Sequence, residues 1–295
     1  MKIAGSNALV LNGAVALIAG ASFLFAARAM LVEETATACS VRYGEGTRFA
    51  IDDGGRALSA SDLQGQANGL DWGLGERVKV SPVEGRSEPF ALEVELANRK
   101  GEARFGSRDH RGAGFMWLPR SAKAGQSACL SYSVYLQDNL DMQSGVELPG
   151  LVGLVPGEEA RGELPPAFSA RVVWQERGAL DVVARTASSQ TNHAIGNDRG
   201  RFDLKPGRWL NIEQELIVNT PGNKDGVVRV WVDGELRLER ATSILADDPK
   251  KTPEIAGVVV GAGPLGRAPD GHGKAQKVWI SAPELRWAPI PQAGL

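Results

Sequence analysis

The chain has 295 residues, of which 43% are hydrophobic and 23% are charged, and its formal net charge is -2. This length allows one large β domain or two small domains. The charge balance is that of an ordinary globular protein, and the basic residues are scattered without interleaved aromatic residues, so we expect no nucleic acid as a partner.

The first 29 residues predict an export signal. Lys2 precedes an apolar run from Ala8 to Ala27, and as a helix this run would span roughly 30 Å, close to one bilayer core. Ala27-Arg28-Ala29 resembles a small-x-small cleavage site, which favours a cleaved signal peptide. The length of the run leaves an uncleaved signal anchor as the alternative. Either interpretation places the rest of the chain outside the cytoplasm, periplasmic or secreted, with membrane contact only through this segment.

The chain has two cysteines, Cys39 and Cys129, and both follow the export segment. In an oxidising compartment, a bridge between them would close a loop of about 90 residues and stabilise the fold by roughly 4 kcal/mol in the chain-entropy model. The alternative is two separate buried thiols, because sequence alone does not say whether the two residues are adjacent.

Beyond residue 38 the pattern is almost entirely β. The predicted strands are short, rich in β-branched and aromatic residues, and separated by clusters of Gly, Pro, Asn and Asp. They cover residues 77–83, 90–97, 114–119, 129–137, 168–175, 179–186, 209–219, 226–240, 255–261 and 277–287. Strands without βαβ alternation indicate a sandwich or jelly roll rather than a parallel sheet. We expect one domain, residues 39–290, and a monomer.

Two segments predict turns. Asp233-Gly234 lies between two alternating runs and suits a two-residue hairpin, in which both residues need a positive φ. The segment SGVELPGLVG, residues 144–153, contains three glycines and a proline, which favour a turn, and a single charged residue, Glu147.

Alternation sorts the residues of the predicted strands by face. In FSARVVWQ, one face contains Phe168, Ala170, Val172 and Trp174, which indicates a core face, and the other contains Ser169, Arg171, Val173 and Gln175. In the same way Asp181, Val183 and Arg185 alternate with apolar residues, as do Asn211, Glu213 and Glu215. Polar faces on several strands suit an open, wet groove. The alternative, which the pattern alone favours, is the ordinary solvent-exposed face of an antiparallel sheet.

Motifs for metal or cofactor binding are sparse. The three histidines, His110, His193 and His272, are isolated and lack metal-ligand spacing, and we expect neither a metal nor a cofactor. His193, in SQTNHAIGN, is a candidate general base if it lies in a groove. The alternative is a structural or exposed histidine in a polar loop.

Between residues 129 and 235 the order of motifs resembles that of polysaccharide lyase family 14, the alginate-lyase-like enzymes. The matching pieces are LPGL, FSARVVW, PGRW and NTPGNKDG followed by VWVDG. The resemblance implies an all-β, concanavalin A-like jelly-roll β-sandwich. It also implies β-elimination at the C4–O bond of a uronic acid in an anionic polysaccharide.

This chemistry needs a cation or hydrogen-bond donors to neutralise the C5 carboxylate, a base for the C5 proton and an acid for the leaving oxygen. The family's Ser and Arg match Ser169 and Arg171. Its lysine position is occupied by Glu147, in the family's LPGL turn, and its two tyrosine positions fall at Val183 and Arg185. The three tyrosines of the chain, Tyr43, Tyr132 and Tyr135, all precede that strand.

Three hypotheses follow. The first is an active polysaccharide lyase in which Arg171 and Arg185 neutralise the carboxylate, Ser169 assists and His193 or another group is the base. The second is a protein with the lyase fold that binds carbohydrate without cleaving it. The third is a structural envelope protein. The candidate substrate-binding residues are Glu147, Gln175, Glu213 and Trp231, the last as a stacking surface for a sugar ring.

Overall fold

The fold was determined as a computed structural model, which describes residues 37–44, 46–67, 71–96, 112–119, 125–138, 140, 145–157, 166–175, 179–187, 193–196, 206–246, 248, 251–264 and 276–287. All of these residues belong to one compact unit, Thr37–Leu295. No helix within these ranges is long and apolar enough to cross a membrane. The predicted export segment, residues 1–29, lies outside the described residues.

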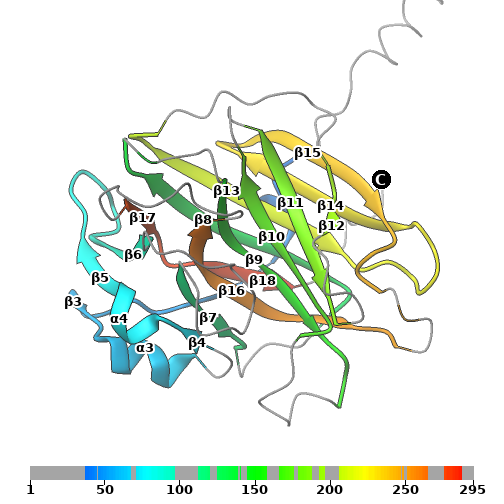
Figure 1. Cartoon of the computed structure of the whole chain (residues 1–295), viewed down its shortest axis with the longest axis horizontal. Helices are drawn as coiled ribbons and strands as arrows, with labels where there is room; N and C mark the ends of the chain where they lie inside the picture. Colours follow the sequence, from blue (N-terminus) through cyan, green and yellow to red (C-terminus); the bar gives the residue numbers. More distant parts are fainter. Residues whose placement is uncertain are drawn as a thin grey trace, which may run out of the picture. The chain divides into compact units, whose positions relative to one another are not determined.

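The described residues form a two-layer β-sandwich (Figure 1). One layer is a nine-stranded sheet with the order β15-β14-β13-β8-β17-β6-β5, extended by β18, which pairs with β8, and by β1, which pairs with β18. Its strands are β1 (Gly46–Arg48), β5 (Val78–Pro82), β6 (Phe90–Leu96), β8 (Ser127–Leu136), β13 (Trp209–Ile217), β14 (Gly226–Val232), β15 (Glu235–Thr242), β17 (Gln276–Ile280) and β18 (Glu284–Trp287).

The other layer is a seven-stranded sheet with the order β12-β11-β10-β9-β16-β7-β4. Its strands are β4 (Asp71–Trp72), β7 (Ala113–Trp117), β9 (Val146–Leu154), β10 (Phe168–Trp174), β11 (Leu180–Thr186), β12 (His193–Ala194) and β16 (Glu254–Pro264). The remaining described elements are the small hairpin β2 (Asp52–Asp53) with β3 (Arg56–Ala57) and three short helices, α2 (Cys39–Arg42), α3 (Ala60–Gln66) and α4 (Leu74–Arg77).

The β-sandwich prediction is confirmed, and each predicted strand overlaps at least one observed strand. The run 277–287 divides into β17 and β18, with Pro283 between them, because proline has no N–H to donate to a sheet ladder. The predicted hairpin turn is present: Asp233 has φ of 52° and Gly234 has φ of 80°. Among the described elements, the short pieces β1–β4 and β12 and the three helices were not predicted.

The segment 144–153 differs from its prediction. It was expected to form a turn, but Val146–Leu154 is β9, a strand hydrogen-bonded to β10 and β16. Pro149 is accommodated because the pairing with β10 shifts register between Arg171 and Val173, an irregularity at which a missing N–H is tolerated. Glycine and proline in this segment therefore belong to an irregular interior strand.

The space between the two sheets is filled by the apolar faces of their strands. Phe168, Ala170, Val172 and Trp174 are fully buried there, as alternation predicted. Gln214 of β13 is a buried polar residue that crosses this core. Its Nε2 donates to the carbonyl of Ala170 at 3.0 Å and its Oε1 accepts from the Leu151 N–H at 3.3 Å. This side chain links the nine-stranded sheet to β9 and β10 of the other sheet.

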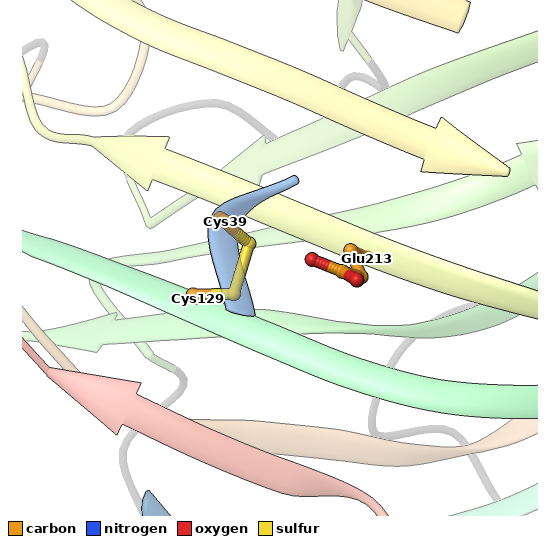
Figure 2. Close-up of side chains that lie close together, drawn as sticks. All are labelled: Cys39, Cys129 and Glu213. Atoms are coloured by element: carbon orange, nitrogen blue, oxygen red, sulfur yellow. A yellow bond between two sulfur atoms is a disulfide. The ribbon is translucent and has the colours of Figure 1, made fainter. Parts of the chain in front are cut away.

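A disulfide joins α2 to β8 (Figure 2). The Cα atoms of Cys39 and Cys129 are 5.8 Å apart, and the bond closes a loop with a sequence separation of 90 residues. Of the two alternatives left open by the sequence, the disulfide is confirmed. It holds the chain that follows the N-terminal segment against the outer face of the nine-stranded sheet.

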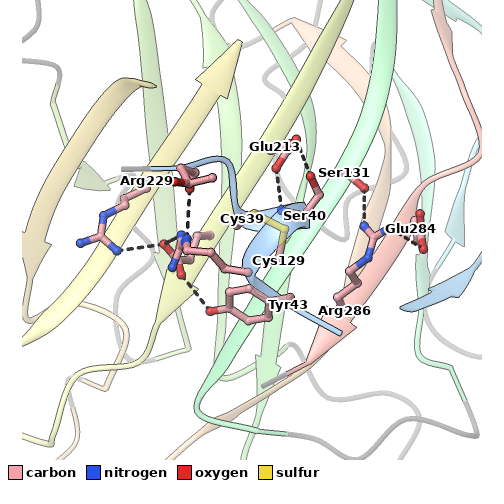
Figure 3. Close-up of a disulfide and its surroundings, with 12 residues drawn as sticks. Cys39, Ser40, Tyr43, Cys129, Ser131, Glu213, Arg229, Glu284 and Arg286 are labelled. Atoms are coloured by element: carbon pink, nitrogen blue, oxygen red, sulfur yellow. Dashed lines mark hydrogen bonds and ion pairs between the residues drawn. A yellow bond between two sulfur atoms is a disulfide. The ribbon is translucent and has the colours of Figure 1, made fainter. Parts of the chain in front are cut away.

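Side chains around the disulfide reinforce this attachment (Figure 3). Arg42 forms an ion pair with Glu215 of β13 at 2.8 Å, and the Tyr43 hydroxyl donates to the same carboxylate at 2.9 Å. Arg229 of β14 contacts Glu215 from the other side at 2.9 Å. Glu215 is therefore a buried carboxylate that ties α2, β13 and β14 together.

Candidate functional site

A cluster of charged side chains lies on the outer face of the seven-stranded sheet. Glu147 comes from β9, Arg171 from β10 and Arg185 from β11, three neighbouring strands. Arg171 Nη1 contacts Glu147 Oε2 at 2.7 Å, and Arg185 Nη2 contacts Glu147 Oε1. One carboxylate is therefore shared by two guanidinium groups, and the sequence did not predict that Glu147 would pair with both arginines.

All three guanidinium nitrogens of Arg171 donate hydrogen bonds. Besides its contact with Glu147, its Nε donates to the carbonyl of Leu148 at 3.0 Å and its Nη2 donates to the carbonyl of Gly261 at 3.1 Å. Its side chain is 5% exposed, whereas that of Arg185 is 19% exposed. Of the two guanidinium groups, Arg185 is therefore the one nearer to solvent.

Burial lowers the pKa of Arg171, and the neighbouring Glu147 carboxylate opposes that shift. An arginine remains protonated at physiological pH in any case, so the consequence is energetic. A buried cation is costly unless it is paired and hydrogen-bonded. Glu147 is thus needed to keep Arg171 in this position.

The backbone beside Arg171 is crowded, and glycines make room for it. Gly150 lies directly opposite Arg171 in the β9–β10 pair. A Cβ atom at residue 150 would lie 2.1 Å from the Ala170 carbonyl oxygen and 2.5 Å from the Arg171 Cα. The glycine of LPGL is therefore required by the close approach of two strands rather than by a turn.

Two further predicted residues lie on this face. Ser169 is paired with Arg185 across the β10–β11 ladder, and Val183 is paired with Arg171. Ser169 is 2% exposed. Asp181, which is paired with Val173, also lies on this face, and burial raises its pKa while hydrogen bonds from the N–H groups of Gly196 and Val182 oppose the shift.

None of the three tyrosines lies on this face. Tyr132 points into the core, where its hydroxyl donates to the carbonyl of Pro149 at 3.2 Å and burial raises its pKa. Tyr43 contacts Glu215 on the nine-stranded sheet. Tyr135 packs against Trp209 and Trp279 on that same sheet. A tyrosine therefore cannot be the proton-transfer group beside Arg171 and Arg185.

The structure separates the other predicted site residues from this cluster. His193 is on edge strand β12 and is paired with Ala184, whose side chain is in the core, so it projects from the opposite side of the sheet to Arg185. Gln175 directly follows β10, and its backbone N–H donates to the Ala179 carbonyl at 2.7 Å. By alternation its side chain is on the same face as Ser169 and Arg171, but Val173 lies between it and Arg171.

Glu213 and Trp231 belong to the nine-stranded sheet, on the other side of the sandwich. Glu213 accepts hydrogen bonds from the N–H and hydroxyl of Ser40, both at 2.8 Å. Trp231 is fully buried, with the Arg42 guanidinium 5.6 Å from its ring centroid, so its ring is not available to stack on a sugar. Alternation gave Glu213 a face but not a sheet, because periodicity does not identify neighbouring strands.

Cys39, Cys129 and Glu213 bring three possible metal-ligating atoms within 4.8 Å of one another (Figure 2). The two sulfur atoms are bonded to each other, and zinc and similar ions bind thiolates. This group is therefore a disulfide beside a carboxylate and not a metal centre.

A family model described as polysaccharide lyase 14 matches residues 87–261, more than half of the chain. No curated protein sequence matches the chain.

Solved structures of alginate lyases are similar in fold. The marine family 14 alginate lyase from Aplysia kurodai is 22% identical, with a TM-score of 0.53 and coverage of 73% of this chain and 88% of that chain. An alginate lyase from Chlorella virus is 14% identical, with a TM-score of 0.52 and coverage of 71% and 88%. A variant of alginate lyase Aly36B, in complex with an alginate trisaccharide, is 15% identical, with a TM-score of 0.55 and coverage of 83% and 98%.

Proposed function

Since the chain belongs to the polysaccharide lyase 14 family, we propose that it binds an anionic, uronic-acid-containing polysaccharide on the outer face of its seven-stranded sheet. We place the function at the Glu147–Arg171–Arg185 cluster, in a fold of the concanavalin A-like jelly-roll kind. The complex of Aly36B with an alginate trisaccharide supports this class of ligand by analogy of fold.

The observation that carries the proposal is the unequal exposure of two arginines around one carboxylate. Glu147 balances one of the two positive charges, so the cluster has a net charge of about +1 from its three ionised groups. Arg171 is buried and donates to Glu147, Leu148 and Gly261. Arg185 is more exposed, and a guanidinium group suits a carboxylate geometrically. Arg185 is therefore the residue assigned to the uronate carboxylate.

We propose binding without tyrosine-assisted cleavage. All three tyrosines of the chain lie away from Arg185, in the core or on the other sheet. An elimination needs a group that removes the C5 proton within hydrogen-bonding reach of the substrate. Glu147, at the position where the resembling lyases have a lysine, also argues against cleavage. It places a carboxylate where an anionic substrate would otherwise meet only cations.

Cleavage by β-elimination is the second candidate, favoured by family membership and by the pairing of Ser169 with Arg185 across the ladder. In that case Arg185 neutralises the C5 carboxylate and a base other than tyrosine removes the proton. We also propose that the protein is exported, because an apolar run from Ala8 to Ala27 precedes the domain and a disulfide suits an oxidising compartment.

The two candidates are separated by one pair of assays on the same preparation. Alginate, polyglucuronate and other polyuronates are tested by affinity electrophoresis for binding and by ultraviolet absorbance for unsaturated uronate. We expect retardation by at least one polyuronate and no increase in absorbance. A steady increase in absorbance would establish the lyase, and the absence of retardation and product across the panel would refute both candidates.

A further inference from the structure

A cleft lies on the outer face of the nine-stranded sheet, on the opposite side of the sandwich from Glu147. Its volume is about 300 Å³, at the lower end of the range for small-molecule sites. It is bordered by α2, β8, β13 and the chain around β18. The side chains that matter for its chemistry are those of Ser40, Ser133, Asn211, Glu213 and Ser281.

These side chains form an ordered set of hydrogen-bonding groups. The Ser133 hydroxyl donates to Asn211 Oδ1 at 2.7 Å, which directs the Asn211 amide nitrogen away from Ser133. Ser40 donates to Glu213, and Arg286 donates at 3.2 Å to the hydroxyl of Ser131, the residue paired with Glu213 across β13 and β8 (Figure 3). Asn211 is exposed. The cleft thus offers hydroxyl, amide and carboxylate groups whose positions are already fixed.

The charged groups of the lining include no excess of cations that would attract an anionic ligand. Arg48 pairs with Glu88 at 2.6 Å, and Arg286 pairs with Glu284 at 2.8 Å. Glu213 adds a third carboxylate, bonded to a serine rather than to an arginine. The lining therefore has one more carboxylate than guanidinium groups, the reverse of the cluster on the other face.

A row of aromatic residues adjoins the cleft. Trp209, Tyr135 and Trp279 lie directly opposite one another across β13, β8 and β17. The Tyr135 ring centroid is 5.7 Å from that of Trp209 and 5.5 Å from that of Trp279, and all three side chains are half-buried. Asn211 and Ser133 are two residues further along the same strands, so they face the same side.

Arg86 connects the row to the cleft. Its guanidinium lies 4.2 Å from the Trp209 ring centroid and donates to the Ser133 hydroxyl at 3.1 Å. It covers part of Trp209, so Tyr135 and Trp279 form an aromatic wall beside the residues that line the cleft. With Arg86 counted, the cleft has three guanidinium and three carboxylate groups, so it carries no excess of positive charge.

We propose that this cleft binds an uncharged sugar unit of a glycan, independently of the polyuronate site on the other face. Sugar hydroxyls pair with the fixed hydroxyl, amide and carboxylate groups, and the C–H face of the pyranose packs against the aromatic wall. The neutral, donor-and-acceptor lining suits hydroxyl groups better than a carboxylate. The disulfide contributes by holding Ser40, the residue after Cys39, against Glu213.

Isothermal titration calorimetry tests this with four defined hexasaccharides. Three are uncharged, the β-1,4-linked hexamers of glucose, mannose and xylose, and the fourth is the β-1,4-linked hexamer of mannuronate. We expect wild-type protein to bind at least one uncharged hexamer, and Asn211→Ala to weaken that binding about tenfold, as expected for loss of a hydrogen bond to a site group. Trp279→Ala is expected to weaken it as well.

Arg185→Ala is the matched control, because it alters only the opposite face, and binding of the uncharged hexamer should be unchanged. The proposal is overturned if no uncharged hexamer binds at millimolar concentration, or if Asn211→Ala binds as tightly as wild type. It is also overturned if Asn211→Ala loses binding of the mannuronate hexamer and not of the uncharged hexamer. Failure of the polyuronate site would appear separately, as mannuronate binding that is absent or insensitive to Arg185→Ala.

Discussion

Glu147 and Arg171 form an ion pair at 2.7 Å on the outer face of a β-sheet, with both side chains less than a tenth exposed. Because the carboxylate also contacts Arg185, it sets the charge that the whole cluster presents. The same residue supports the strand geometry and limits the chemistry of the site.

Removing Glu147 should destabilise the fold strongly. In Glu147→Ala, Arg171 stays buried without its anion, and breaking such a pair typically costs about 3–5 kcal/mol. Urea unfolding at neutral pH measures this loss. The double variant Glu147→Leu/Arg171→Met should recover much of the stability, since apolar residues often replace a buried ion pair at little cost. Equal stability of wild type and Glu147→Ala would contradict the role given to this pair.

Stability should fall in acid through Glu215. Burial acts to raise its pKa, but hydrogen bonds from Arg42, Arg229 and Tyr43 outweigh it and hold the pKa below the ordinary value of 4.5. A carboxylate with a depressed folded pKa stabilises the fold above its unfolded pKa, and this contribution is lost as the pH falls through the folded value.

Thermal melts from about pH 5 to about pH 3 should therefore show decreasing stability. The slope should be shallower in Glu215→Gln, which cannot ionise. Asp225 also has a lowered pKa but is fully exposed, so Asp225→Asn is the control variant for Glu215→Gln. If wild type and Glu215→Gln lose the same stability between about pH 5 and about pH 3, Glu215 is not the source of the acid sensitivity.

Breaking the disulfide should destabilise the domain. For a bridge closing a loop of this size, loss typically costs about 2–5 kcal/mol. The double variant Cys39→Ser/Cys129→Ser should therefore unfold at lower urea than wild type, and wild type with reductant should match it. Ser40→Ala, which keeps the bridge, should change stability much less. Unchanged stability of the double serine variant would show that α2 is held without the bond.

The sequence predicted the sandwich because strand signals are local. Alternation placed Phe168 and Trp174 in the core and Ser169 and Arg171 on the outer face, and the structure has both pairs there. The turn at Asp233-Gly234 was predictable for the same reason, since its φ angles depend on the residues themselves.

Strand neighbours were not predictable in this way. Glu213 has the same alternation as Arg171 but belongs to the other sheet, and Trp231 is covered by Arg42, a residue 189 positions earlier in the chain. The segment around Pro149 resembled a turn because the register shift that accommodates it involves a different strand. Such long-range pairings leave no periodic signal.

The most direct test of the central claim is the affinity of a polyuronate hexamer for wild type, Arg185→Ala and the surface control Arg56→Ala, which removes an equal charge from the β2–β3 hairpin. Calorimetry at two salt concentrations should show binding about tenfold or more weaker in Arg185→Ala, weakening of wild-type binding with salt, and no effect of Arg56→Ala. If Arg185→Ala binds the hexamer as tightly as wild type does, the polyuronate site is not at the Glu147–Arg171–Arg185 cluster.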